Sequence, residues 1–359
     1  MRFVRGIKAT GRLCAQTCTR AEHQQNSDGK ARFHTLIFDA SLPVRKVTLV
    51  ALLTGAEVRI GCRTPGFLLL LLSLVHFGMS LTAPIASFAY AVGAACMWGI
   101  SDFVGGYTAR RFQAFFLAAL GHLSGTVLMF LVAVAANGSF PNNVQLAWAA
   151  AAGVAGGISL ALFYRALSQG NMGIAAPVTA VLSAGIPTIY AIVLQGSPGP
   201  VTLGGFGLAL LGLWLVSRSE EGTRPKGLGL ALVSGVGFAL FFIFIKKTGT
   251  ADALWTAACA RAASFAVTGT ITIAGWKFRP RYRFGIVLGV FAGCIDVTGT
   301  FLFVRASQTG RLDTAVVLSS LYPAITVFTA WLVLHEKLTR WKTVGVLAAL
   351  VAIPIIARG

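Results

Sequence analysis

From Met79 to the end of the chain, apolar stretches of about 17–22 residues alternate with short polar breaks. At 1.5 Å rise per residue, a helix of about 20 residues crosses the hydrocarbon core of a bilayer. Only 11% of the residues are charged, against about 25% in a soluble domain, so lipid is the expected solvent. The ten predicted spans lie near residues 84–106, 113–135, 145–165, 173–195, 201–218, 227–246, 253–275, 284–305, 313–334 and 341–357.

These spans are predicted to be helices because each is about twice the length of a membrane β-strand and does not alternate apolar with polar residues. A continuous helix also satisfies its backbone groups internally, as lipid requires. GxxxG spacing favours close approach of neighbouring helices. We interpret it here as packing, and it occurs at Gly121/Gly125, Gly153/Gly157 and Gly289/Gly293.

The first 78 residues differ from the rest, since they hold eleven of the thirty Lys and Arg residues. Their apolar run at 66–78 is short for a membrane span. Three interpretations stay open. The favoured one is a misassigned start, with Met79 as the initiator. The others are an Arg-rich targeting segment and a genuine cytoplasmic or interfacial extension, disordered in itself.

The core of the chain repeats itself at a shift of 140 residues, without a gap, between 163–218 and 303–358. Arg165 then falls on Arg305 and Gly170 on Gly310, matches that shared apolar composition explains poorly. We therefore predict an all-α membrane protein of ten transmembrane helices in two inverted five-helix repeats, at about 84–218 and 227–358. Five is odd, so the second repeat enters the membrane from the opposite side. Such repeats are typical of secondary transporters; a duplicated scaffold without transport is the alternative.

Three stretches resemble the drug/metabolite transporter superfamily, specifically its EamA-like ten-span members. They are AACMWGISDFVGG at 94–106, LSSLYPAITVFTAWLVLHEKLTRWKTVGVLAAL at 318–350, and the pair RALSQG and RASQTG that closes the third and eighth spans. The resemblance implies export or uptake of small metabolites, often amino acids or drug-like molecules, without naming one substrate.

The two halves depart from the family pattern in different ways. Glu336 and Pro323 resemble the family, but their counterparts in the first half are Gly196 and Ser183. Pro177 and Pro187 are instead expected to break the fourth span. A symmetric site is therefore not assumed.

Charged and titratable side chains within spans are costly and are candidates for function. Asp102 is a candidate to bind a substrate amine or to accept a proton, or else is an interfacial residue. Arg261 is a candidate to bind a substrate carboxylate, or else pairs with Asp102 or Asp296. His122 matches Arg261 at a shift of 139 and is a proton carrier or a packed, hydrogen-bonded histidine. Asp296, opposite Gly156 in the repeat, is a further candidate.

Aromatic and proline residues complete the candidate site. Trp98, Trp255 and Tyr322 are expected to line a cavity, with an interfacial belt as the alternative. Pro177, Pro187 and Pro323 are gating candidates because proline kinks a helix. Asp313 is expected near a helix N-terminus, where a carboxylate complements the helix dipole.

No enzyme, metal-site or P-loop motif occurs in the sequence, so neither cofactor, metal nor ATP is expected. We predict a secondary active transporter, an exporter, that works by alternating access with protons as a candidate coupling ion. The alternatives are a non-transporting membrane partner or assembly protein and an intramembrane enzyme. The expected partners are lipid and a small-molecule substrate, and a homodimer stays open. Nucleic acid is not expected, because the basic residues lie in short loops.

The expected location is the bacterial cytoplasmic (inner) membrane. Loops after odd-numbered spans hold most of the core Lys and Arg residues, whereas the other loops hold Lys246, Lys247, Arg305 and Arg311. The positive-inside rule then places the loops after odd-numbered spans in the cytoplasm and both ends of the core outside. The basic residues 1–78, if they are a genuine extension, favour the opposite orientation.

Overall fold

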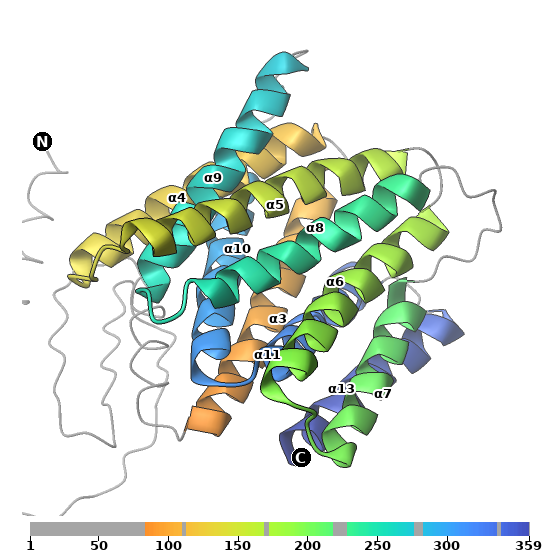
Figure 1. The fold of residues 1–359 in the computed structure, drawn as a ribbon. Coiled ribbons are helices and arrows are strands. Elements are labelled where there is room, and N and C mark those ends of the chain that lie inside the picture. Colours follow the sequence, from red (N-terminus) through yellow and green to blue (C-terminus); the bar gives the residue numbers. More distant parts are fainter. Residues whose placement is uncertain are drawn as a thin grey trace, which may run out of the picture. The chain divides into compact units, whose positions relative to one another are not determined.

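The computed structural model describes residues 83–109, 113–168, 172–217, 228–275, 283–335 and 339–358. The interpretations of residues 1–78, and of Glu336, lie outside these residues. The first half of the described chain forms five helices (Figure 1), which are α3 (Ala83–Ala109), α4 (Ala114–Ala135), α5 (Asn143–Ser168), α6 (Met172–Gln195) and α7 (Pro200–Ser217).

The second half forms five spans from six helices. They are α8 (Leu228–Lys247), α9 (Ala253–Ala274), α10 (Arg283–Thr309), α11 (Leu312–Ser319), α12 (Tyr322–Leu334) and α13 (Arg340–Arg358). Within the described residues, ten helical segments are long and apolar enough to cross a membrane, and every regular element is a helix. The prediction of ten membrane helices is confirmed.

The ninth span is broken rather than continuous. A turn at Ser320 and Leu321 separates α11 from α12, and Pro323 stands in the first turn of α12. Proline suits that position because a first-turn N–H has no partner within the helix. The membrane span predicted near 313–334 is confirmed at Leu312–Leu334, but its helix is interrupted by this turn.

The fourth span, by contrast, is one continuous helix where a break was predicted. The prediction that Pro177 and Pro187 break it is wrong, because α6 runs unbroken from Met172 to Gln195. Each proline removes one N–H from the helix, a loss that local adjustment and neighbouring helices allow in a membrane.

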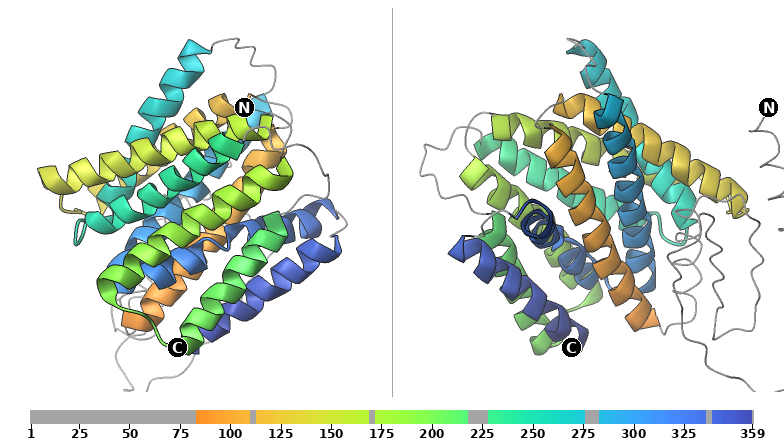
Figure 2. Two further views of the ribbon diagram at one scale, coloured as in Figure 1. Left: turned by 45° about the vertical axis from the view of Figure 1, so that its right-hand side comes forward. Right: turned by 180° about the vertical axis from the view of Figure 1, so that it is seen from behind.

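The most extensive helix contacts recur when the two halves are exchanged. Helix α3 packs on α10 as α8 packs on α5, and α4 packs on α10 as α9 packs on α5. Counterpart helices also meet directly, α4 with α9 and α7 with α13. Figure 1 shows α5 beside α8 and α7 beside α13, and the view from behind in Figure 2 shows α3 beside α10.

Counterpart helices run in opposite directions. Along α7, Gly205 approaches Ile356, whereas Gly212, two turns later, approaches Gly345 and Ala349 earlier in α13. Helix α4 meets α9 in the same antiparallel sense, since Phe130 contacts Trp255 and His122 lies near Arg261. The two five-span repeats are therefore inverted relative to each other.

Glycines at matched positions let the helix backbones approach. A Cβ at Gly153 of α5 would lie 2.0 Å from the Ala260 carbonyl oxygen of α9. A Cβ at Gly293 of α10 would lie 2.2 Å from the Gly121 carbonyl oxygen of α4. Gly153 and Gly293 are equivalent at the shift of 140, and Gly121 and Ala260 are equivalent at 139. The packing interpretation of these GxxxG pairs is confirmed.

Gly153→Ala is expected to destabilise the protein by about 1–3 kcal/mol, because the new methyl group forces α5 away from α9. Gly207→Ala is the matched control, since a Cβ at Gly207 on α7 meets nothing within 4 Å. Thermal unfolding in detergent should show a lower midpoint for Gly153→Ala and an unchanged or higher midpoint for Gly207→Ala. Equal midpoints for the two variants would contradict the assigned α5–α9 contact.

Candidate functional site

A cavity of about 520 Å³ lies among helices of both repeats. Its lining includes Asp102 and Thr108 of α3, His122 of α4, and Arg261 of α9. It extends to Ser217, the last residue of α7. The cavity therefore runs from the central parts of the spans toward the face where α3 and α7 end.

An ion-paired cluster forms one wall of this cavity. The Arg261 guanidinium lies 3.0 Å from the Asp296 carboxylate and donates a hydrogen bond to the Thr300 hydroxyl. Its other terminal nitrogen is 3.5 Å from Nδ1 of His122. These residues come from the central parts of α4, α9 and α10, so the cluster joins the two repeats within the membrane.

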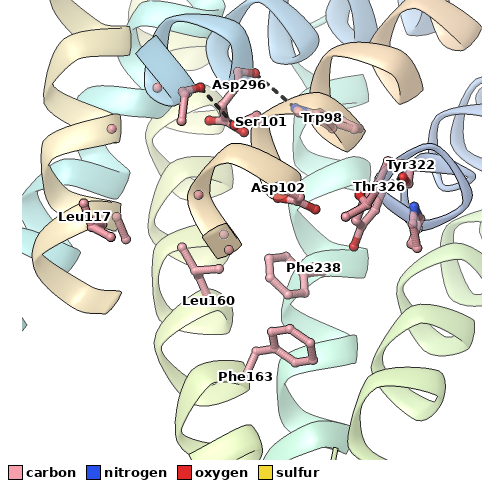
Figure 3. A pocket seen from close by; sticks show the side chains of 18 of the residues that line it. Trp98, Ser101, Asp102, Leu117, Leu160, Phe163, Phe238, Asp296, Tyr322 and Thr326 are labelled. Carbon is pink, nitrogen blue, oxygen red and sulfur yellow. Dashed lines mark hydrogen bonds between the residues drawn. The ribbon is translucent and has the colours of Figure 1, made fainter. Parts of the chain in front are cut away.

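Helix α3 is fixed against α10 beside this cluster. The Trp98 indole donates a hydrogen bond to the Asp296 carbonyl oxygen over 3.1 Å, and the Ser101 hydroxyl donates one to the Ala292 carbonyl oxygen over 2.9 Å. Both bonds are drawn in Figure 3. Gly299 makes room for the indole, because a Cβ there would lie 2.6 Å from the Trp98 ring. These contacts position Asp102, one residue after Ser101, at the cavity surface.

Asp102 differs from Asp296 in having no partner. Its side chain is exposed and lines the cavity, and no hydrogen bond or ion pair joins it to another residue of the described ranges. Figure 3 shows its carboxylate facing the same space as Phe238 and Thr326. It is therefore an unpaired carboxylate at the cavity surface.

Aromatic rings form much of the remaining lining. Trp98 packs edge-on against Tyr322, with ring centroids 6.3 Å apart, and both residues line the cavity. Phe163 of α5 and Phe238 of α8 line it on the other side of Asp102 in Figure 3. Pro323, beside Tyr322 at the break between α11 and α12, lines the cavity as well.

Other predicted residues lie elsewhere. Trp255, expected at the cavity, is outside its lining; its indole donates to the Gly138 carbonyl oxygen over 2.9 Å, so it joins α9 to the α4–α5 turn. Pro187 is buried in α6, also outside the lining. The backbone of Pro177 lies within α6, and its side chain is outside the described part.

Several lining residues were not expected from the sequence. Phe163 and Phe238 resemble ordinary apolar packing residues, and Ser101 and Thr326 resemble helix hydroxyls that bond to their own backbone. The sequence offered one usable signal, for Ser101. It stands next to Asp102, where two polar residues interrupt the apolar first span. Thr300, the hydroxyl partner of Arg261, lies one helical turn after Asp296.

The opposite end of the spans is held together across the two repeats. Arg311 donates to the carbonyl oxygens of Gln195, over 3.3 Å, and Gly196, over 2.6 Å. The same guanidinium pairs with the fully buried Asp313 over 2.6 Å. We call Arg311, Asp313, Gln195 and Gly196 the Arg311 cluster.

Two further contacts at this end join the repeats. Ser87 of α3 donates a hydrogen bond to the Ala306 carbonyl oxygen of α10 over 2.9 Å. The Arg305 guanidinium lies 5.7 Å from the ring centroid of Tyr90.

The prediction that Asp313 lies near a helix N-terminus is confirmed, since it stands in the first turn of α11.

Arg261→Gln is expected to destabilise the protein by about 2–4 kcal/mol, because it leaves the Asp296 carboxylate without its cationic partner. Removing that charge as well, in Arg261→Gln/Asp296→Asn, should recover part of the loss. Denaturant unfolding of the two variants measures the difference. A double variant no more stable than the single one would contradict the pairing of Arg261 with Asp296.

Comparisons with known proteins agree with this architecture. A solved crystal structure is similar over 75% of this chain and 96% of its own, with a TM-score of 0.61 and 14% sequence identity; a likeness at that identity shows a shared fold. No curated protein matches the sequence significantly. The sequence model of the EamA-like transporter family matches twice, over residues 85–218 and 225–358. The chain therefore belongs to the EamA-like transporter family of the drug/metabolite transporter superfamily and is an integral, multi-pass membrane protein.

Proposed function

We propose that the chain is a secondary active transporter that moves small organic solutes by alternating access through the cavity between its repeats. The observation that carries this proposal is the position of Asp102, His122, Arg261 and Asp296 in a cavity lined by both inverted repeats. Inverted repeats suit alternating access because each half can adopt the arrangement of the other, which exposes one central site to either face.

The difference between the two ends of the spans supports a state in which the cavity opens toward one face of the membrane only. The cavity reaches the last turn of α3 and α7 at one end, whereas the Arg311 cluster and the Ser87–Ala306 hydrogen bond join the repeats at the other. A transporter needs one end closed while the other is open. The reverse state then requires these cross-repeat contacts to separate.

Export is the proposed direction. The cavity extends toward the loops that follow the odd-numbered spans, and these hold most of the core Lys and Arg residues. By the positive-inside rule that face is cytoplasmic, so the state described loads solute from the cytoplasm. Residence in a bacterial cytoplasmic membrane and assembly as a homodimer remain predictions.

Proton coupling is proposed for Asp102. A carboxylate without a protein partner in a membrane cavity can bind either a proton or a cationic group of the solute, and such residues mark transport pathways. Competition between the two at one carboxylate would exchange solute for proton.

Proteoliposomes that contain the purified protein are expected to release selected solutes faster than protein-free vesicles. The vesicles would be loaded with a defined mixture of amino acids, organic amines and nucleosides, and release would be followed by mass spectrometry. Asp102→Asn should slow that release at least about tenfold, because it removes the only unpaired carboxylate that the described part of the chain places in the cavity.

Asp252→Asn is the matched control for the flux measurement. Asp252 lies outside the cavity and caps α9 through Leu254 and Trp255, and asparagine caps helices equally well. Release of every solute at the protein-free rate would contradict transport and favour a non-transporting membrane partner.

Arg311→Ala is expected to open the end that the Arg311 cluster closes. In a background without native cysteines, Thr326→Cys would report on the cavity, which Thr326 lines. Its labelling by a membrane-impermeant maleimide from the face of the Arg311 cluster should rise roughly three- to tenfold, because the closed state loses about 1 kcal/mol relative to the open one.

Arg340→Ala provides the comparison, since Arg340 is an exposed residue at the start of α13. It removes the same charge without touching the Arg311 cluster, and labelling should stay at its original rate. Equal labelling rates in the Arg311→Ala and Arg340→Ala proteins would show that the Arg311 cluster does not hold that end closed.

A further inference from the structure

We infer that the cavity selects solutes that carry one positive charge on an apolar or aromatic body, with the cationic group at Asp102. This inference rests on the proposed transport function for its biological meaning. It concerns which class of solute the same cavity binds, and binding can be measured without transport.

The first argument is the charge of the cavity wall. Besides His122, three acidic or basic side chains of the described residues line it, namely Asp102, Asp296 and Arg261. Arg261 and Asp296 neutralise each other across 3.0 Å. With His122 counted as neutral and Asp102 ionised, the described part of the wall has a formal charge of −1, located on Asp102. A bound monovalent cation would bring the site to neutrality, which is strongly favoured away from bulk water.

The second argument is that Arg261 is already occupied. Its guanidinium pairs with Asp296, donates to Thr300 and lies beside His122, and the residue is only 9% exposed. A solute carboxylate would have to displace Asp296 and leave that carboxylate unpaired. The arrangement therefore disfavours anions, and the earlier interpretation of Arg261 as a carboxylate-binding residue gives way to its pairing interpretation.

The third argument is the chemistry around Asp102. Trp98, Phe163, Phe238 and Tyr322 line the cavity. In Figure 3, Trp98 and Tyr322 lie to one side of Asp102 and Phe238 to the other, with Phe163 beyond Phe238. Aromatic faces attract organic cations and also bury apolar groups. A metal cation would need several oxygen ligands, whereas an alkylammonium group needs one carboxylate and an apolar surround. The volume of about 520 Å³ is that of a small-molecule site.

The test is equilibrium binding of four probes with one shared phenyl group. They are 2-phenylethylamine, its permanently charged trimethylammonium analogue, neutral 2-phenylethanol and anionic 3-phenylpropanoate. Calorimetry on the purified full-length protein in detergent, at neutral pH, should show the two cations binding roughly tenfold or more tightly than the alcohol and the carboxylate, since one charge-assisted contact distinguishes them.

Variants then identify the charge responsible. Asp102→Asn should remove the preference for cations, and Asp102→Glu should retain it. Asp102→Asn/Asp296→Asn leaves Arg261 without a carboxylate partner, so the preference should reverse toward 3-phenylpropanoate. Asp252→Asn, outside the cavity, should bind all four probes as the original protein does. Circular dichroism and gel filtration would confirm that each variant is folded.

The outcomes separate this inference from the proposed function. Equal affinities, a preference for the carboxylate, or no saturable binding of either cation in the original protein would overturn the cation inference. Retention of the preference in folded Asp102→Asn would overturn the assignment to Asp102. Selective cation binding without flux in proteoliposomes would uphold the charge selectivity and contradict transport. Flux of only neutral or anionic solutes would uphold transport and contradict the charge selectivity.

Discussion

Close approach of helix backbones across two inverted repeats is the constraint on which the rest of this structure depends. In lipid, apolar side chains gain little by leaving their surroundings, so helices associate through van der Waals packing at small residues and through buried hydrogen bonds. Gly153 against Ala260 and Gly293 against Gly121 provide that packing in matched places. The same contacts fix α4, α9 and α10 at the depth where His122, Arg261 and Asp296 meet.

The cavity borders this tight packing, since Gly121 and Gly293 also line it. Large aromatic side chains and α12, the second half of the broken ninth span, line more of the space. Two carboxylates border this space with different surroundings. Asp296 is paired with Arg261 and helps to join the repeats, whereas Asp102 has no such partner among the described residues. Asp296 thus helps to hold the helices together, whereas Asp102 is the carboxylate that we propose binds a solute or a proton.

Much of the fold could be predicted from the sequence, because the length of each apolar run and the repeat at a shift of 140 residues can both be read from the order of residues along the chain. The shift of 139 also placed His122 and Arg261 at equivalent depths, although their contact depends on packing of α4 against α9. The rotation of each helix about its axis could not be predicted, because neighbours set it. Trp255 therefore faces the α4–α5 turn and Phe238 faces the cavity. The break before Pro323 was missed since Ser320 and Leu321 carry no turn signature.

The central claim is that the two repeats move against each other about the cavity. It is tested most directly by electron–electron double resonance in lipid bilayers, with spin labels on α3 of the first repeat and α13 of the second at both ends. One pair replaces the exposed Tyr107 and Val344 at the end that the cavity reaches, and the other replaces the exposed Ile85 and Ala357 at the opposite end. The account predicts two populations, in which the first distance shortens as the second lengthens. A single fixed pair of distances, or two distances that change together in the same direction, would contradict it.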